Sequence, residues 1–510
     1  MGFSIFDYLV VLLYMVGVIV FGLVISGKQR STADYFLGGH QIPWWAVLFS
    51  LVATETSTLT FISIPAVAYG GNLTFLQITF GYILGRTLVS IIFLPRYYQG
   101  NLTTAYQFLG ERFGDGMRNV TSSTFMLTRL LADGVRLFAS AIPIAIILRL
   151  ANFKVSDLNV YFISIMLISA VTFIYTFLGG IRAVIWMDVI QMCIYIGGAF
   201  LAVGIILARL PQGLTSAVGF LQNAGKLKLF RLGFDLPFRD FIAQPYTFFT
   251  AVIGGGVFSI ASHGTDQLMV QRLLTTRDVR SGKKALIISG FVVFLQFSLF
   301  MFIGLLLYSF YSGKAPALLG LATTDEIFAK FIVEEIPSGL SGLIVAAILA
   351  AAMSTLSSSI NSLASSTMMD LYKPYWGKNN SSEKDLRISR IITIIWGIII
   401  TSSAFLFALL QLNSPGQRPA VVELGLGIAS YTYGGLLGAF LLGILSKKLR
   451  RLDAITGFFA GLIALLFLVK GPVQILLPGE GLTIAWPLYT MVGSIIVIVV
   501  GYISYMFRNL

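Results

Sequence analysis

A serine-rich stretch, Ala350–Ser366 (AAAMSTLSSSINSLASS), places eight hydroxyl side chains inside a segment apolar enough to cross a membrane. Residues three and four apart share one face of a helix, so these hydroxyls gather in sets. One set is Ala351, Ser354 and Thr355, and the other is Ser354, Ser357 and Ser358. Ser354 belongs to both. Uncharged oxygens suit a hard cation. Close packing of small residues explains the same composition, so both interpretations stay open from this stretch alone.

A second polar stretch, Ala53–Thr60 (ATETSTLT), lies near the middle of another apolar segment, and Pro65 follows it. Threonine is a modest helix former and proline removes a backbone hydrogen bond, so we expect local unwinding. Unwound backbone at bilayer depth is tolerated only where it packs in protein or lines a water-filled cavity. Glu55 is a functional-site candidate because intramembrane carboxylates are costly. The alternative is a kinked packing helix with Glu55 protonated or paired with an arginine.

A third stretch carries Gly254–Gly256 and then the polar run Ser262–Gln267 (SHGTDQ). Each glycine costs a helix about 1 kcal/mol relative to alanine, so a second break is expected here. Interrupted helices in corresponding places of two halves are typical of transporters built as inverted repeats. We therefore predict two five-helix halves related by inversion.

Charged side chains lie in two further predicted spans. Arg129, Asp133 and Arg136 are spaced so that one helix face can hold an ion-pair ladder. This ladder is either a buried structural network or part of a ligand site. Asp188 lies a turn or two into the membrane and is either a cation ligand or the partner of Arg182.

Composition identifies the elements that must position these residues. The 510 residues are 56% hydrophobic and only 11% charged, whereas soluble domains are about 25% charged. Many apolar runs exceed the roughly 18 residues that span a bilayer. The chain is therefore predicted to be an all-α polytopic membrane protein. Its net charge of +13 then reflects membrane topology and not nucleic-acid binding, and its single cysteine and two histidines exclude a cysteine framework and a zinc cluster.

The hydropathy pattern divides into about thirteen spans. They are expected at residues 4–25, 44–70, 75–97, 120–148, 159–178, 184–208, 247–271, 285–312, 338–368, 388–412, 420–445, 453–469 and 484–507. Five regions follow: an extra N-terminal helix and loop (1–43), a first repeat (44–208), an outer loop (209–246), a second repeat (247–445) and two C-terminal helices (446–510). The predicted inner loops hold 20 of the 35 basic residues and the outer loops 11, which favours an external N-terminus and a cytoplasmic C-terminus.

Enzymatic and receptor functions find little support in the sequence. No phosphate-binding GxxxxGK[ST] motif is present, so a P-loop pump is excluded. A membrane enzyme would need a base near an interface, and His40 is the only plausible one, without a second group beside it. A sensor on the same fold remains the alternative of another class. We expect no catalytic residues, no organic cofactor, no nucleic acid and no required protein partner.

Four motifs together resemble the sodium:solute symporter family. They are Ala33–Gly39 (ADYFLGG), Gly179–Gln191 (GGIRAVIWMDVIQ), Gly264–Arg272 (GTDQLMVQR) and Ala350–Leu371. The resemblance covers nearly the whole chain. It implies the LeuT-type inverted-repeat fold with one extra N-terminal and two extra C-terminal helices. It also implies a symporter in the plasma or bacterial inner membrane, in contact with lipid, that couples a small solute to sodium.

The resemblance also implies two sodium sites. The first would lie between the broken second span and the ninth span, with ligands from Ala53, Thr56, Ala351, Ser354 and Thr355. The second, deeper toward the inside, would use Asp188, Ser354, Ser357 and Ser358. All four residues of the second set suit sodium, so we predict two sodium ions per cycle.

The solute site implied by the resemblance lies between the second and seventh spans. Its candidate residues are Thr58, Thr60, Gln77, Arg136, Ser262, His263 and Gln267. In the sugar carriers an aromatic pair stands where this chain has Ser262 and His263, so sugar stacking on that span is not expected. Arg136 and His263 favour a carboxylate-bearing solute such as sialic acid or a monocarboxylate. The alternatives are a sodium-coupled sugar or inositol symporter and coupling to protons through Glu55 or Asp188.

Overall fold

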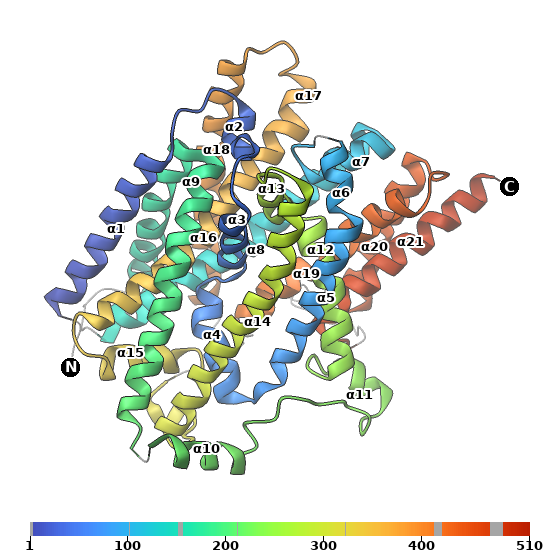
Figure 1. The fold of residues 1–510 in the computed structure, drawn as a ribbon. Coiled ribbons are helices and arrows are strands. Elements are labelled where there is room, and N and C mark those ends of the chain that lie inside the picture. The colour runs from blue at the N-terminus through green and yellow to red at the C-terminus, as the bar shows by residue number, and fades with distance from the viewer. Residues whose placement is uncertain are drawn as a thin grey trace.

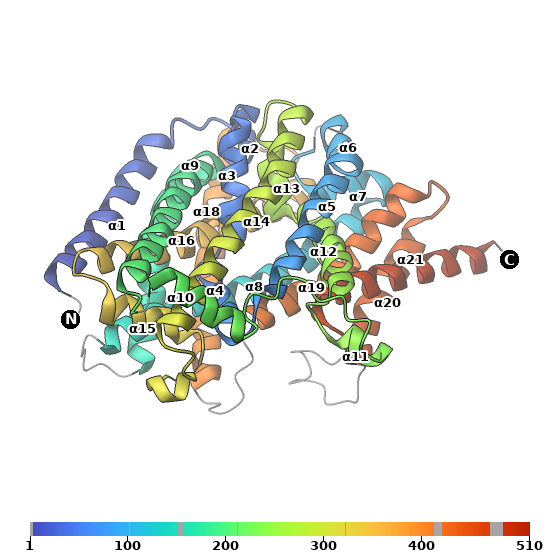
Figure 2. The same ribbon diagram turned by 60° about the horizontal axis from the view of Figure 1, so that its bottom comes forward.

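The computed structural model describes residues 4–100, 102–150, 157–211, 213–321, 323–412, 421–469 and 483–509. Helices make up nearly all of the regular structure in these residues, which confirms the all-α class. Figure 1 shows a bundle with α1 (Ile5–Ile25) on one flank and α20 (Arg451–Leu468) and α21 (Tyr489–Arg508) on the other. The view turned by 60° keeps this arrangement, with the broken helices in the middle (Figure 2).

Long helices account for most of the bundle between these flanks. They are α5 (Gln77–Ile92), α8 (Asp115–Leu150), α9 (Asp157–Arg209), α14 (Val279–Phe310), α16 (Leu340–Ser366), α18 (Ser382–Leu412) and α19 (Val421–Leu445). In the described ranges, nine helices are long and apolar enough to cross a membrane, or up to ten if the one bent pair counts as a span. A polytopic membrane protein is thereby confirmed, whereas the number thirteen stays a prediction.

Short helices connect the long ones at both ends of the bundle. They are α2 (Thr32–Leu37), α6 (Leu94–Gln99), α7 (Ala105–Phe113), α10 (Gly213–Asn223), α11 (Phe238–Ala243), α15 (Glu326–Glu335) and α17 (Lys373–Tyr375). Figure 1 places α2, α7 and α17 at one end, and α10 and α11 at the other. The predicted outer loop, 209–246, therefore contains two helices that the hydropathy pattern did not indicate.

Helix α9 is two helices joined at Gly180. At about 1.5 Å per residue, its 53 residues would be far longer than a bilayer of about 30 Å, so the chain must turn. Gly180 turns it with a φ of 55° and a ψ of −155°. Tyr175 before the turn donates to the carbonyl of Met353 (3.1 Å), and Asp188 after the turn accepts from Ser354 (2.6 Å). Both halves thus reach the same turn of α16, and the kink at Gly180 falls between the predicted spans 159–178 and 184–208.

The second span is broken, as predicted. It consists of α3 (Trp44–Glu55) and α4 (Thr58–Gly70), which are bent by 58°. Thr56 and Ser57 between them have extended backbone, with ψ of 97° and 175°. The break therefore lies within the Ala53–Thr60 stretch, while Pro65 remains inside α4.

The seventh span is also broken, and its break follows the glycine triplet. The span consists of the π-helical turn Thr250–Gly254, α12 (Gly255–Gly264) and α13 (Gln267–Leu274). Asp266 sits at the break in extended conformation, and its side chain accepts from the amide of Leu268. The glycines serve packing instead, because a Cβ on Gly255 would lie 2.6 Å from the Ile78 side chain of α5.

Helix α16, which carries the serine-rich stretch, is the most deeply enclosed long helix among the described residues, with 94% of its best window buried. It packs against α9, α8, α1 and α3. Its N-terminus is capped by Asp7 of α1, whose Oδ1 accepts from the amides of Gly339 (2.8 Å) and Gly342 (2.7 Å) and from the hydroxyl of Ser341 (2.6 Å). Helix α1 is thereby attached to the helix that carries the predicted sodium ligands.

Candidate solute and sodium sites

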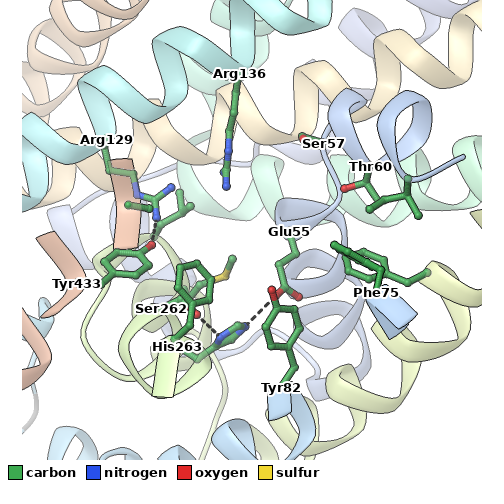
Figure 3. A pocket seen from close by; sticks show the side chains of 16 residues that line it. Glu55, Ser57, Thr60, Phe75, Tyr82, Arg129, Arg136, Ser262, His263 and Tyr433 are labelled. Carbon is green, nitrogen blue, oxygen red and sulfur yellow. Dashed lines mark hydrogen bonds and ion pairs between the residues drawn. The ribbon is translucent and has the colours of Figure 1, made fainter. Parts of the chain in front are cut away.

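A cavity lies where the break between α3 and α4 faces α8 and α12. The empty space within it measures about 830 Å³, open solvent at its mouth included. Figure 3 shows polar side chains from several helices converging on it. The lining residues are Glu55, Ser57, Thr60, Ile64, Phe75, Tyr82, Arg129, Arg136, Phe258, Ser262, His263, Leu268, Met269, Phe297, Ala429 and Tyr433. A wall that combines apolar side chains with placed polar and charged groups is typical of a small-molecule site.

The predicted ladder on α8 exists and continues to other helices. Asp133 lies 3.4 Å from Arg129 and 3.6 Å from Arg136. Arg129 also pairs with Asp266 at the break of the seventh span and donates to Tyr433. Arg129 therefore contacts two carboxylates, whereas Arg136 shares one of them at a longer distance. The Arg136 guanidinium points into the cavity (Figure 3), and its side chain is 17% exposed.

Glu55 takes its positive partner from α5. The fully buried Arg86 donates to Oε2 of Glu55 and, through its other terminal nitrogen, to the hydroxyl of Ser289 (2.6 Å). The alternative that Glu55 is paired with an arginine is thus correct, and the arginine is Arg86. Oε1 of Glu55 lies 3.8 Å from Nε2 of His263. Glu55 keeps 19% of its side chain exposed and lines the cavity.

The seven solute candidates separate into two groups. Thr60, Arg136, Ser262 and His263 line the cavity together. Thr58 donates instead to the carbonyl of Ile348 on α16 (3.2 Å). The side-chain amide of Gln77 donates to the backbone carbonyl of Tyr246 (2.9 Å), and that of Gln267 donates to the carbonyl of Thr103 (3.1 Å). Both glutamines therefore bind the backbone of neighbouring segments.

The first predicted sodium set lies where α3 ends beside α16. Ala53 is in the last turn of α3, where carbonyls lose their intrahelical donors. Thr56 donates to the carbonyl of Val52 (2.8 Å), which turns its side chain back onto α3. On α16, the Thr355 hydroxyl donates to the carbonyl of Ala351 (3.3 Å). The hydrogen bond from Thr58 of α4 to the carbonyl of Ile348 connects the helix break to α16 next to this set.

The second predicted set forms a compact buried cluster. Asp188 accepts from Ser354 through Oδ1 (2.6 Å) and from Ser50 through Oδ2 (2.5 Å). The hydroxyls of Ser357 (3.0 Å) and Ser358 (2.7 Å) donate to the carbonyl of Ser354 on their own helix. Ser354 connects the two sets, as its position on the helix predicted.

Arg272 completes this cluster and corrects one sequence interpretation. Counted among the cytoplasmic loop residues, it is instead fully buried in α13. Its guanidinium lies 3.3 Å from Asp188, donates to Ser358 and, through Nε, to Ser50 (2.9 Å). Asp188 therefore faces Arg272 and not Arg182. Without Arg272 the predicted inner side still holds 19 basic residues against 11 outside, so the predicted orientation is unchanged.

Sequence reasoning missed Arg86, Arg272 and Ser50 as members of these clusters. Arg86 carried a signal, because an arginine within a predicted span needs a partner. Ser50 lies one turn before Thr54, whose hydroxyl is 3.2 Å from that of Ser358, so it shares the α3 face toward α16. Arg272 offered no comparable signal, because the hydropathy pattern placed it just after the end of the predicted seventh span, 247–271.

Two broken helices that meet around a polar cavity in a membrane bundle define a secondary transporter. Residues 35–461 match the Sodium:solute symporter family, and the chain belongs to this family. The predicted resemblance is confirmed.

Similar proteins include several sodium-coupled carriers. A sodium/sialic acid symporter NanT of Aliivibrio fischeri is 30% identical over 100% of this chain and 94% of its own length. A sodium/iodide cotransporter of Homo sapiens is 30% identical over 87% of this chain and 66% of its own. The solved structure of a Na⁺-coupled sialic acid symporter, substrate-bound and outward-open, superposes with a TM-score of 0.83 at 29% identity and covers 99% of this chain and 98% of that one.

Proposed function

We propose that this protein imports a small carboxylate-bearing solute by sodium-coupled symport, with two sodium ions per cycle. The orientation of Arg136 carries the proposal. Its guanidinium points into the cavity and shares Asp133 with Arg129, so it retains donors for a bidentate carboxylate contact. Similarity to sialic acid symporters from two bacteria, Aliivibrio fischeri and Proteus mirabilis, supports a carboxylate solute.

The charges around the cavity balance before any ligand binds. Three arginines, at positions 86, 129 and 136, face three carboxylates, at 55, 133 and 266. A solute anion would add one negative charge to this buried network. Sodium beside it offsets that charge, which favours binding of ion and solute in the same conformation and thereby couples them.

Sodium would bind at the two predicted sets on either side of Ser354. The first uses carbonyls at the α3 break with Thr355, and the second uses Asp188 with the α16 serines. Each sodium gains about 2.3 kcal/mol when it moves inward through 100 mV. Two ions supply about twice that, but the solute anion moves inward against the field, so the net single charge leaves about 2.3 kcal/mol, or somewhat under two decades of solute accumulation at about 1.4 kcal/mol per decade.

Alternating access would follow from movement of one helix set against the other. We propose residues 44–208 and 247–445 as the two inverted repeats, with the site at their shared breaks. The N-terminus would face the outside and the C-terminus the cytoplasm, in a cell membrane whose lipids surround the bundle.

A sugar or inositol solute is the second candidate. Aromatic residues in the cavity wall favour it, because sugar rings pack on aromatic faces: Phe75, Tyr82, Phe258, Phe297 and Tyr433. The two candidates differ in the role of Arg136, because binding of a neutral sugar does not require a positively charged side chain.

Uptake into proteoliposomes tests the proposal. We expect a sodium gradient to drive accumulation of labelled sialic acid or lactate, and Arg136→Gln to abolish it. Accumulation of glucose or inositol that survives Arg136→Gln would favour the second candidate. Uptake that is unchanged without sodium and follows pH would contradict sodium coupling.

A further inference from the structure

Glu55 and His263 present two atoms to each other at the wall of the cavity. Oε1 of Glu55 lies 3.8 Å from Nε2 of His263, which is longer than a direct hydrogen bond. Both residues line the cavity, and Figure 3 shows them opposite Arg136. The pair is therefore placed to contact the part of a solute that Arg136 does not hold.

Each side chain of the pair is fixed from behind. Arg86 holds the other oxygen of Glu55. Nδ1 of His263 lies 3.2 Å from the carbonyl of Ser259 and 2.9 Å from the hydroxyl of Ser262. A carbonyl oxygen only accepts hydrogen bonds, and the Ser262 hydroxyl donates to the same carbonyl (3.3 Å), so we assign the hydrogen to Nδ1, where it faces these two acceptors.

This hydrogen on Nδ1 sets the chemistry of Nε2. A neutral imidazole has one N–H and one acceptor nitrogen, so Nε2 is the acceptor. Among the described residues, Nε2 of this buried histidine has no hydrogen-bond partner. Two acceptors thus face each other across a gap that a donor group of the ligand can fill. A buried acceptor left without a donor costs about 1–3 kcal/mol.

We infer that Glu55 and His263 form a donor-recognition subsite, so the solute carries a hydroxyl or N–H group in addition to its carboxylate. The inference rests on the proposed function, because Arg136 orients the carboxylate end. The subsite selects hydroxylated or amino-bearing carboxylates and rejects simple ones. A carboxylate without a donor leaves both acceptors unpaired, and a second anionic group would be repelled by Glu55.

Binding measurements on the purified full-length protein in saturating sodium test this inference. The probes are sialic acid, which has hydroxyl and amide donors, L-proline, which has an N–H donor, and pyruvate, which has none. We expect at least one donor-bearing probe to bind about tenfold or more tightly than pyruvate, as the cost of unpaired acceptors requires. Tighter binding of sialic acid would indicate that the subsite prefers a hydroxyl or amide donor, and tighter binding of L-proline would indicate an amino donor.

Variants of the two histidines provide the control. His263→Asn keeps an N–H that can face Ser259 and removes the acceptor at Nε2, so the preference over pyruvate should fall to about threefold or less. His263→Gln places an amide oxygen near Nε2 and should restore part of the preference. His40→Asn changes the other histidine, which contacts Leu274 away from the cavity (2.7 Å), and should leave the preference unchanged. Glu55→Gln reports on the same subsite if His263→Asn does not fold.

The outcomes separate this inference from the proposed function. Sodium-dependent binding of pyruvate as tight as that of both donor probes overturns the subsite and leaves symport standing. A preference that persists in folded His263→Asn and Glu55→Gln proteins overturns it as well. If no carboxylate binds in sodium, the proposed function fails, and the subsite fails with it.

Discussion

Arg272 lies 3.3 Å from Asp188 and donates to Ser358, so the carboxylate predicted to bind sodium already has a positive partner from α13. Both side chains are fully buried. Helix α13 belongs to the broken seventh span, and Asp188 belongs to the second half of α9. The ion pair therefore connects the helix break to the second predicted sodium set, and movement of α13 would change the charge that a sodium ion meets there.

Replacing Asp188 should affect both stability and sodium coupling. Asp188→Asn leaves Arg272 buried without its carboxylate, which costs roughly 3–5 kcal/mol. Adding Arg272→Gln should recover much of the thermal stability of the purified protein. In whichever variant folds, the Hill coefficient of sodium-dependent uptake should fall toward one. A coefficient that stays above one would remove Asp188 from the second site.

Ser354 should be the most sensitive hydroxyl of α16. It belongs to both predicted sets and donates to Asp188 (2.6 Å), and a hydrogen bond to a charged group contributes about 1.5–3 kcal/mol. Ser354→Ala should raise the sodium concentration for half-maximal uptake by about tenfold or more. Ser362→Ala is the matched control, because its hydroxyl donates only within α16, to the carbonyl of Ser359 (3.0 Å). If both substitutions changed the sodium concentration for half-maximal uptake equally and only slightly, the stretch Ala350–Ser366 would serve packing and not sodium binding.

Ser359 shows where prediction from one helix reaches its limit. Both predicted sets leave out Ser359, yet its hydroxyl donates to Asp133 of α8 (2.6 Å). The hydroxyl pattern grouped Ser354 with Ser357 and Ser358, because positions three and four apart share a face, whereas their grouping with Asp188 came from the family resemblance. Which helix approaches each face depends on tertiary packing. Both helix breaks could be predicted from the polar runs Ala53–Thr60 and Ser262–Gln267, whereas the contacts that Arg86 and Arg272 make depend on which helices approach them.

Arg136 should determine solute binding more than sodium binding. Truncating one partner of a buried charge contact costs about 2–5 kcal/mol, so Arg136→Gln should weaken binding of a carboxylate solute by about 30-fold or more. Sodium binding without solute should change much less, since Arg136 lies on α8, outside both predicted sodium sets. Calorimetric titrations with each ligand separate the two effects. Comparable losses for solute and sodium would show that Arg136 acts on the fold and not on the solute.

Asp7 should contribute to stability through the N-terminus of α16. Its carboxylate accepts two amides and a hydroxyl there, and Asp7→Asn replaces one acceptor oxygen by a donor that faces those N–H groups. We expect a loss of roughly 1–3 kcal/mol, seen as a lower unfolding temperature in detergent. Asp235→Asn, at an exposed position between α10 and α11, is the control and should leave this temperature unchanged. An equal effect of both substitutions would exclude a specific role for the cap.

Gly255 should be required for the close contact between α12 and α5, the helices that carry His263 and Arg86. A Cβ at Gly255 would lie 2.6 Å from the Ile78 side chain and 2.9 Å from its carbonyl, so Gly255→Ala must push the helices apart. Overpacking of this kind costs about 1–3 kcal/mol. Because the shift separates Glu55 and Arg86 from His263, solute affinity should fall together with the unfolding temperature. Gly204→Ala is the matched control: it is helical and has no neighbouring atom within 4 Å of the added Cβ, so it should be neutral or slightly stabilising. If Gly255→Ala behaved like Gly204→Ala, the glycine triplet would have to act through helix flexibility and not through packing.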